Sequence, residues 1–235
     1  KVVDDSEFDS ACDMAELVIE FLDVHADVFF NGAYLGQNLY RRVFLMKNVF
    51  LLGDSIRRGY QNKVKAKLEG KANVFFPSEN GRFTAYTLNC LVPSFWLAGL
   101  PKLDIIHWNN GIWDSVICFQ EDGPFTPLDE YERNLRRILR ELQKLAPRVI
   151  FATTTPPRQD TRVDRTGKIQ SIEHIIARND VALRVMNEND VEVNDLYSVI
   201  YKNREGYILD DLVHMNDEGY EALADTVVDC IGKYL

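Results

Sequence analysis

The sequence of 235 residues lacks the features that define several specialised classes of protein. It contains no apolar run close to the roughly 20 residues that a membrane-spanning helix requires. Acidic residues outnumber basic ones by 36 to 27, so the chain lacks the basic face that nucleic-acid binding needs. It also has no glycine-rich loop of the kind that cradles phosphates, which argues against nucleotide binding. We therefore expect neither a membrane span nor a nucleic-acid partner.

Histidine and cysteine are both scarce, with four of each. The histidines stand apart from clustered acids and the cysteines lack metal-ligand spacing, so we expect no metal and no cofactor. Scattered cysteines are typical of free, buried thiols in a reducing compartment; here they are Cys12, Cys90, Cys118 and Cys230. No secretory leader with a cleavage site is visible after Lys1. We expect a cytoplasmic protein whose start has been trimmed or processed.

What the sequence does contain is a regular alternation of short apolar runs with amphipathic stretches. The apolar runs predict five strands, at residues 49–52, 73–76, 104–107, 148–152 and 191–193. Strands that alternate with helices form parallel sheets covered on both faces. The predicted fold class is α/β: a three-layer α/β/α sandwich around a flavodoxin-like five-stranded parallel sheet in the order 2-1-3-4-5.

Capping residues and prolines mark where the helices begin and end. Thr126, followed by Pro127, predicts the N-cap of a helix that ends before Pro147. A last helix is predicted after Asn216 or Asp217 as its cap. The remaining helices are predicted at residues 56–68, 82–98 (kinked or split at Pro93) and 171–189.

Residues 1–45 fall outside this alternation. Apolar residues at helical spacing in 13–22 predict a helix, and residues 28–30 fit a short strand or a core contact. We expect a partly helical N-terminal extension at 1–45, followed by one α/β domain at 46–235. Three roles remain open for the extension: packing on the sheet edge, adding a small strand, or self-association into a homo-oligomer.

The most informative motif is Gly53-Asp54-Ser55, where an apolar run stops. A serine there would lie at the carboxyl edge of the sheet, where open α/β folds bind their ligands. A serine hydroxyl becomes a good nucleophile only beside a base. Asp211 and His214, three residues apart, supply an orienting carboxylate and an imidazole in the chain order Ser, Asp, His. The set favours acyl transfer, although Ser55 could also simply cap the next helix.

These motifs resemble those of the SGNH (GDSL-type) hydrolases, which are serine esterases and lipases on a flavodoxin-like sheet. The resemblance covers residues 46–235: residues 53–56 are similar to the family's first block, and 211–214 to its last. It implies that Ser55, Asp211 and His214 are catalytic and that no cofactor is required. It also implies an oxyanion hole that uses the amides of Ser55 and of Gly81, which stands where the second block should fall.

The third block departs from the family's usual Gly-x-Asn-Asp. Gly111 and Asp114 match, but Trp113 takes the place of the asparagine and cannot supply its carboxamide. The segment is similar to a branch of the family that reads His-Phe-Asn-x-Gly-Leu-x-Asp, in which the first asparagine corresponds to Asn109. We therefore rank Asn109 above Asn110 as the remaining oxyanion donor.

Other residues near these motifs have plain structural interpretations. We expect Asp54 to bond nearby backbone and His107 to be a core histidine. Trp108 and Trp113 fit either core packing or the wall of a substrate pocket. Most arginines at the active edge are expected to be solvated, with one able to grip an anionic substrate group; they are Arg57, Arg58, Arg82 and Arg158.

The function that combines these observations is hydrolysis of a small acyl ester, with an acetyl ester of a carbohydrate as the first expectation. One alternative is a lipid or thioester acyl hydrolase, which the polar loops 115–126 and 153–167 disfavour. Another is a non-catalytic ligand-binding module that kept the fold. Trp113 favours that module, and the intact serine, aspartate and histidine disfavour it.

Overall fold

The computed structural model describes residues 46–235, except 93–94, 120–122 and 165. The predicted extension at 1–45 lies outside the described residues, so the domain boundary at residue 46 stays a prediction. Within the described part, Cys90 and Cys230 are buried free thiols and Cys118 is a half-buried one. No helix in that part of the chain is long and apolar enough to cross a membrane.

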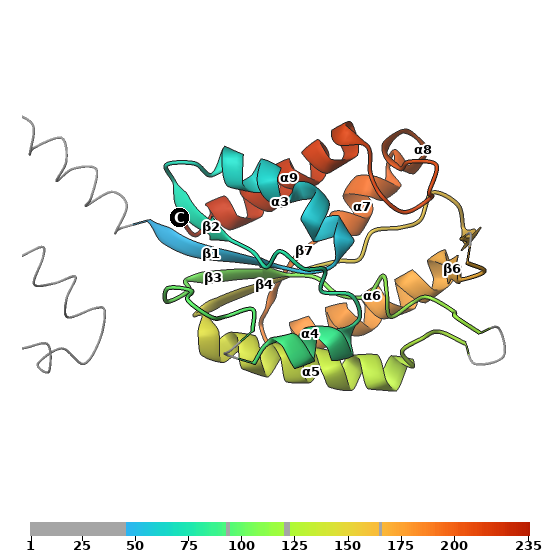
Figure 1. Cartoon of the computed structure of the whole chain (residues 1–235), viewed down its shortest axis with the longest axis horizontal. Coiled ribbons are helices and arrows are strands. Elements are labelled where there is room, and N and C mark those ends of the chain that lie inside the picture. Colours follow the sequence, from blue (N-terminus) through green and yellow to red (C-terminus); the bar gives the residue numbers. More distant parts are fainter. Residues whose placement is uncertain (1–45, 93–94, 120–122, 165) are drawn as a thin grey trace, which may run out of the picture. The chain divides into compact units, whose positions relative to one another are not determined.

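A five-stranded parallel sheet forms the centre of the fold (Figure 1). Every pair of neighbouring strands in it is parallel, which confirms the predicted order 2-1-3-4-5 with β7 as the fifth strand. Because the strands run the same way, their carboxyl ends meet at one edge. In spatial order the strands are β2 (Ala72–Phe75), β1 (Lys47–Leu52), β3 (Ile105–Trp108), β4 (Arg148–Ala152) and β7 (Glu192–Asn194).

Helices cover both faces of this sheet (Figure 1). One layer contains α3 (Ser55–Lys67), α7 (Leu196–Tyr201), the short α8 (Arg204–Tyr207) and α9 (Asp217–Gly232). The opposite layer contains α4 (Thr84–Cys90), α5 (Leu128–Leu145) and α6 (Ile172–Asn187). The result is the predicted three-layer sandwich.

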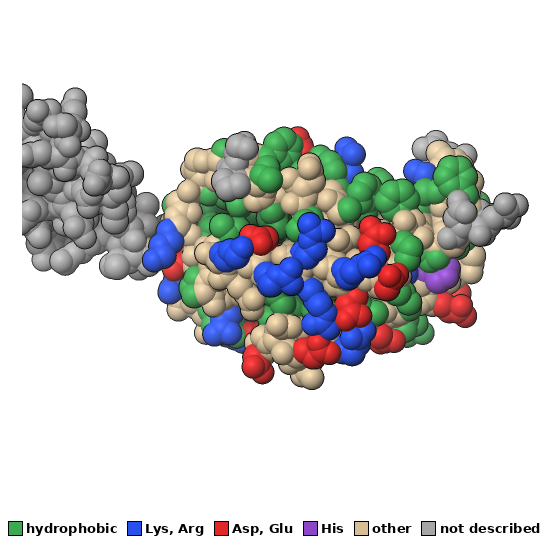
Figure 2. Space-filling view, turned by 90° about the horizontal axis from the view of Figure 1, so that it is seen from below, with side chains coloured by type: hydrophobic (Ala, Val, Ile, Leu, Met, Phe, Trp, Pro, Cys, Tyr) green, Lys and Arg blue, Asp and Glu red, His purple; other side chains and the backbone are tan. Residues whose placement is uncertain are grey.

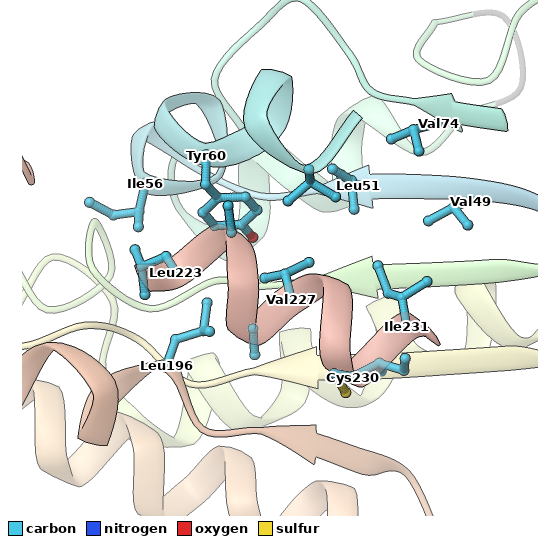
Figure 3. Close-up of a cluster of buried hydrophobic side chains, with 14 of the residues drawn as sticks. Val49, Leu51, Ile56, Tyr60, Val74, Leu196, Leu223, Val227, Cys230 and Ile231 are labelled. Atoms are coloured by element: carbon cyan, nitrogen blue, oxygen red, sulfur yellow. The ribbon is translucent and has the colours of Figure 1, made fainter. Parts of the chain in front are cut away.

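Successive residues of β1 serve two separate cores, since side chains alternate across a strand. Val49 and Leu51 belong to the core beneath α3 and α9, where Tyr60 and Val227 also lie (Figure 3). Phe50 and Leu52 belong to the core on the side of α4, α5 and α6. All four β1 side chains are almost completely buried, which explains why the run is apolar without alternation.

The outer face of the α4–α6 layer is covered by basic and acidic side chains in mixture (Figure 2). Glu132 of α5 links Arg136 of the same helix with Arg184 of α6 at 2.8 and 2.7 Å. Exposed pairs of this kind contribute little stability individually. This surface shows no single sign of charge that would attract a polyanion.

Two predicted helix boundaries are wrong. The helix predicted at 82–98 is α4, which ends at Cys90, ahead of Pro93. α5 begins at Leu128 with Pro127 rather than Thr126 in the N-cap position, and no side chain caps it. Thr126 does not serve as the cap because it is buried and bonds Asp114 instead.

The loop predicted at 153–167 and the residues just after it also contain structure that the sequence did not indicate. An antiparallel hairpin pairs β5 (Thr161–Val163) with β6 (Ile169–Ser171). Ile169 also exchanges two backbone hydrogen bonds with Ile117, at 2.8 and 2.9 Å. The hairpin therefore fastens the two long loops to each other beside the carboxyl edge of the sheet.

Candidate active site

Ser55 lies where β1 ends and α3 begins. Asp54 is the N-cap of α3, and its Oδ1 accepts a hydrogen bond of 2.9 Å from the Ile56 N–H. The expected structural role of Asp54 is therefore what the geometry shows. Gly53 is required by close approach, since a Cβ there would lie 1.8 Å from Asn109 Oδ1. The turn presents Ser55 as the first residue of a helix, where its own N–H has no intrahelical partner.

Ser55, His214 and Asp211 form a continuous hydrogen-bonded chain. His214 Nε2 lies 2.8 Å from Ser55 Oγ, and His214 Nδ1 lies 2.6 Å from Asp211 Oδ2. With the ring proton on Nδ1, the imidazole donates to the carboxylate and accepts the serine proton. The His214 and Asp211 side chains are 40% and 46% exposed, so the chain is open to substrate and water.

The loop before α9 holds the acid and the base in place. Asp211 Oδ1 accepts from the N–H groups of Val213 and His214, at 3.0 and 2.9 Å. Partial burial raises the pKa of Asp211, but these two bonds and the bond from the His214 ring outweigh it, so its pKa lies below the ordinary value. The carboxylate is thus the favoured form opposite the imidazole. Leu209 N–H donates to His214 O at 2.8 Å and closes the loop.

Asn109 and Asn110 make different contacts. Asn109 Nδ2 donates to Asp54 Oδ2 at 3.2 Å, and one more N–H of this amide remains. Asn110 Nδ2 is used twice, donating to Arg82 O and to Thr87 Oγ1, both at 3.0 Å. Its Oδ1 accepts from Trp108 Nε1 at 2.7 Å. Asn110 is therefore tied into the core, while Asn109 lies against Gly53 in the nucleophile turn.

Gly81 is close to the nucleophile turn, but its amide is already engaged. The Gly81 N–H donates to the Gly53 carbonyl at 2.9 Å, which corrects the expectation of a free oxyanion donor. A Cβ on Gly81 would lie 2.6 Å from the same carbonyl oxygen. Glycine at this position therefore permits backbone-to-backbone contact between the two segments.

The remaining residues of interest divide between core and surface. Trp108 is fully buried against Phe151, whereas Trp113 lines a pocket. His107 is buried, as expected, and burial lowers its pKa to about 4. Asp114 is buried and accepts from the backbone and hydroxyl of Thr84, at 3.0 and 2.7 Å.

The four arginines at this edge have different surroundings. Arg58 and Arg82 are exposed, and Arg158 pairs with Asp210 at 2.9 Å. Arg57, however, is fully buried, which makes it an exception to the expectation that most of these side chains are solvated. Basic residues in a first helical turn are usually solvated, and the sequence carries no signal for this burial.

A pocket of about 330 Å³ opens beside the nucleophile and has Ser55 and His214 in its wall. Its size is at the lower end of the range for small-molecule sites, roughly 300–1,000 Å³. Lys168, Asp164 and Gln170 contribute polar groups from the β5–β6 hairpin region. The apolar lining residues are Phe83, Ile112, Trp113, Val116, Phe125, Ile169 and Val213. The described residues include no cluster of three or more side chains suited to bind a metal ion.

Comparison with known proteins agrees with this architecture. No family model matches the chain. The GDSL esterase/lipase WDL1 of Oryza sativa subsp. japonica is 26% identical over 140 residues, which is 54% of this chain. The match spans about half (52%) of the length of that curated relative.

Solved structures share the fold over most of the chain. A lipase/acylhydrolase from Enterococcus faecalis has a TM-score of 0.65 with 21% identity, over 80% of this chain and 96% of its own. Axe2, an acetylxylan esterase from Geobacillus stearothermophilus, has a TM-score of 0.62 with 20% identity, over 79% and 94%.

The fold and site define an α/β protein in which a serine, a histidine and an aspartate are linked by hydrogen bonds at the carboxyl edge of a parallel sheet. The curated match and the shared fold make the chain similar to a GDSL esterase/lipase and to solved structures of a lipase/acylhydrolase and an acetylxylan esterase.

Proposed function

We propose that this protein hydrolyses carboxylic esters through an acyl-serine intermediate. The observation that carries the proposal is the pair of hydrogen bonds from Ser55 Oγ through the His214 ring to Asp211. Ser55 Oγ attacks the ester carbonyl as His214 Nε2 takes its proton. His214 then returns the proton to the leaving alcohol, and Asp211 stabilises the imidazolium that forms in between. Water, deprotonated by His214, releases the acid from Ser55 in the second half of the reaction.

The negative charge on the tetrahedral intermediate needs hydrogen-bond donors. We propose the Ser55 N–H at the start of α3 and the remaining N–H of Asn109 Nδ2. The positive end of the helix dipole supports the first of these. Because the Gly81 N–H is given to Gly53, Gly81 serves here by allowing close contact rather than as a donor.

Turnover of p-nitrophenyl acetate by the purified protein tests this function. We expect Ser55→Ala to abolish turnover, because the proposed mechanism requires the acyl-serine intermediate and alanine cannot form it. A fluorophosphonate should label Ser55, as located by mass spectrometry. Ser78→Ala, an exposed serine in the neighbouring loop, is the matched control and should keep wild-type turnover. Undiminished turnover in Ser55→Ala would reject the serine-esterase proposal.

For the substrate, we propose a small acyl ester, with an acetyl ester of a carbohydrate as the first candidate. The modest volume of the pocket supports a small ester. Several solved structures that share the fold are described as acetylxylan esterases.

The apolar lining of the pocket favours a second candidate, a lipid or thioester with a longer acyl chain. The loop 115–126 is less polar at this place than expected, since Val116 and Phe125 face the pocket and Phe119 is 71% exposed. Comparing kcat/KM for acetyl and octanoyl esters of p-nitrophenol separates the candidates. We expect the acetyl ester to be preferred, and a preference for octanoyl would favour the second candidate.

A further inference from the structure

Arg57 is a buried basic residue beside Ser55 to which the proposed chemistry gives no role. It lies in the first turn of α3, two residues after the nucleophile, and its relative exposure is 0%. Burying a guanidinium is costly unless its N–H groups are bonded. The partners of Arg57 therefore indicate what its burial serves.

The Arg57 guanidinium donates to backbone carbonyls of two separate segments. Nη1 donates to Pro77 O at 2.8 Å, and Nη2 donates to Glu79 O at 2.5 Å. Nη2 also donates to Gly53 O at 3.1 Å. Pro77 and Glu79 belong to the loop between β2 and α4, and Gly53 belongs to the nucleophile turn. A single planar fork thus joins the loop to the turn.

The same junction is closed by direct backbone contact. Gly53 O, which accepts from Arg57, also accepts from the Gly81 N–H at 2.9 Å. A Cβ on either glycine would clash, at Gly53 with Asn109 and at Gly81 with Gly53. The segments that follow β1 and β2 therefore meet backbone to backbone, and Arg57 bonds both of them. The segment that follows β3 contributes the Asn109 side chain, which lies against Gly53.

The charge of Arg57 reaches the third segment through Asp54. Both side chains are fully buried, and Asp54 Oδ2 accepts from Asn109 Nδ2 at 3.2 Å. Burial raises the pKa of Asp54 to about 6, and the Ile56 N–H, Asn109 and the charge of Arg57 all oppose this rise. Burial lowers the pKa of Arg57 to about 10, against the opposing effect of Asp54. Arg57 thereby favours the carboxylate that holds the Asn109 amide.

We propose that Arg57 is a positioning residue for the oxyanion hole: its guanidinium fixes the nucleophile turn to the 77–81 loop and, through Asp54, keeps the Asn109 amide in place. This proposal rests on the proposed ester hydrolysis. Because the oxyanion develops only in the transition state, misplaced donors lower kcat and leave KM unchanged. A role in folding alone would lower the melting temperature without lowering kcat at constant KM.

The test compares Arg57→Lys with Arg58→Lys, its exposed neighbour on the same helix turn. Lysine keeps the charge at position 57 but cannot bond three carbonyls in one plane. Arg57→Lys is assayed well below its melting temperature. We expect its kcat for p-nitrophenyl acetate to fall 10- to 100-fold while KM stays within twofold of wild type. This loss of kcat is on the order of the loss of one oxyanion donor, or less. Affinity for phenylboronic acid, which forms a tetrahedral serine adduct, should fall in parallel. Arg58→Lys should match wild type in each measurement.

A milder variant keeps the proposal falsifiable if Arg57→Lys does not fold. Gln61, whose Oε1 accepts from Arg57 Nη1, can be changed to Met, which leaves the guanidinium in place but removes its side-chain acceptor. We expect Gln61→Met to lower kcat and boronate affinity in the same direction by a smaller factor. Wild-type kcat and boronate affinity in Arg57→Lys, or in Gln61→Met when Arg57→Lys is unfolded, overturns the proposal. Absence of both turnover and fluorophosphonate labelling in the wild type overturns the ester-hydrolase proposal itself, and this inference with it.

Discussion

Two neighbouring asparagines at the end of β3 illustrate how one amide can serve chemistry while the next serves folding. Asn109 touches the nucleophile turn through Asp54. Asn110 instead links Trp108, Arg82 and Thr87 inside the molecule. Because the two residues have the same side chain and almost the same place, they form a natural matched pair.

We expect Asn109→Ala to lower kcat by about 10²–10³, the usual cost of one oxyanion donor. Asn110→Ala should instead destabilise the fold by about 1–3 kcal/mol, since it leaves buried partners without hydrogen bonds. Ester turnover and urea unfolding of both variants measure the two effects. The opposite assignment, with Asn110→Ala folded and slow, would make Asn110 the oxyanion donor.

At the scale of elements, the contact between α3 and α9 sets the distance between nucleophile and base. α3 begins at Ser55, and α9 begins three residues after His214. Gly59 allows this contact, because a Cβ there would lie 2.0 Å from the ring of Tyr220. Close packing of the two helices therefore requires glycine at position 59, although glycine is a poor helix former.

Gly59→Ala should lower the free energy of unfolding by about 1–3 kcal/mol, because the Tyr220 ring must move to admit the methyl group. Gly232→Ala is the control at the end of α9, where a Cβ meets nothing within 4 Å. That variant should be neutral or more stable by up to about 1 kcal/mol, since alanine is the better helix former. Urea denaturation curves give both values. Equal stability of the two variants would show that α3 and α9 have room to adjust.

Elements with strong local signals could be predicted from the sequence. β1 ends in a continuous apolar run, and α9 follows a capping Asn216 whose Oδ1 accepts from the Gly219 N–H at 2.9 Å. Ser55 could be found because it follows an apolar run directly, and Asp211 and His214 because they stand three residues apart in a short motif before the last helix.

Features that depend on distant partners could not be predicted. β5 and β6 are three residues long and show no alternation of apolar and polar residues. They pair with each other, and β6 also pairs with Ile117, which lies far away in the sequence. The burial of Arg57 depends on carbonyls 20 or more residues further along the chain. The engagement of the Gly81 amide likewise depends on Gly53, which sequence patterns do not reveal.

For the whole molecule, two buried groups make the stability depend on pH with opposite signs. Burial raises the pKa of Asp54 from 3.8 to about 6, so the folded state holds a proton that the unfolded state releases between pH 4 and 6. Stability from this group therefore falls as pH rises through that window. Burial lowers the pKa of His107 from 6.5 to about 4, so the unfolded state takes up a proton in this range before the folded state does. Stability from this group therefore falls as the pH drops from 6.5 to 4.

The two effects are each on the order of 3 kcal/mol and should largely offset each other in the wild type between pH 4 and 6. Asp54→Asn removes one of them. We expect this variant to lose stability, relative to wild type, as the pH is lowered from 7 to 4.5, and His107→Gln to gain it. Urea unfolding at both pH values measures these differences. Parallel behaviour of the two variants and wild type would show that neither group titrates between these pH values.

The long separation of Ser55 from His214, 159 residues, has a consequence for how the protein is made. A ribosome adding about 5–20 residues per second needs roughly 8–30 s to pass from one to the other. All five strands of the sheet are synthesised before Asp211 and His214. All five strands are therefore present in a nascent chain that still lacks a base for the serine. Under the proposed mechanism, ester cleavage would report the arrival of the segment that leads into α9. A translation product stopped before it would lack the base for Ser55, and also α9, whose buried residues cover one face of the sheet.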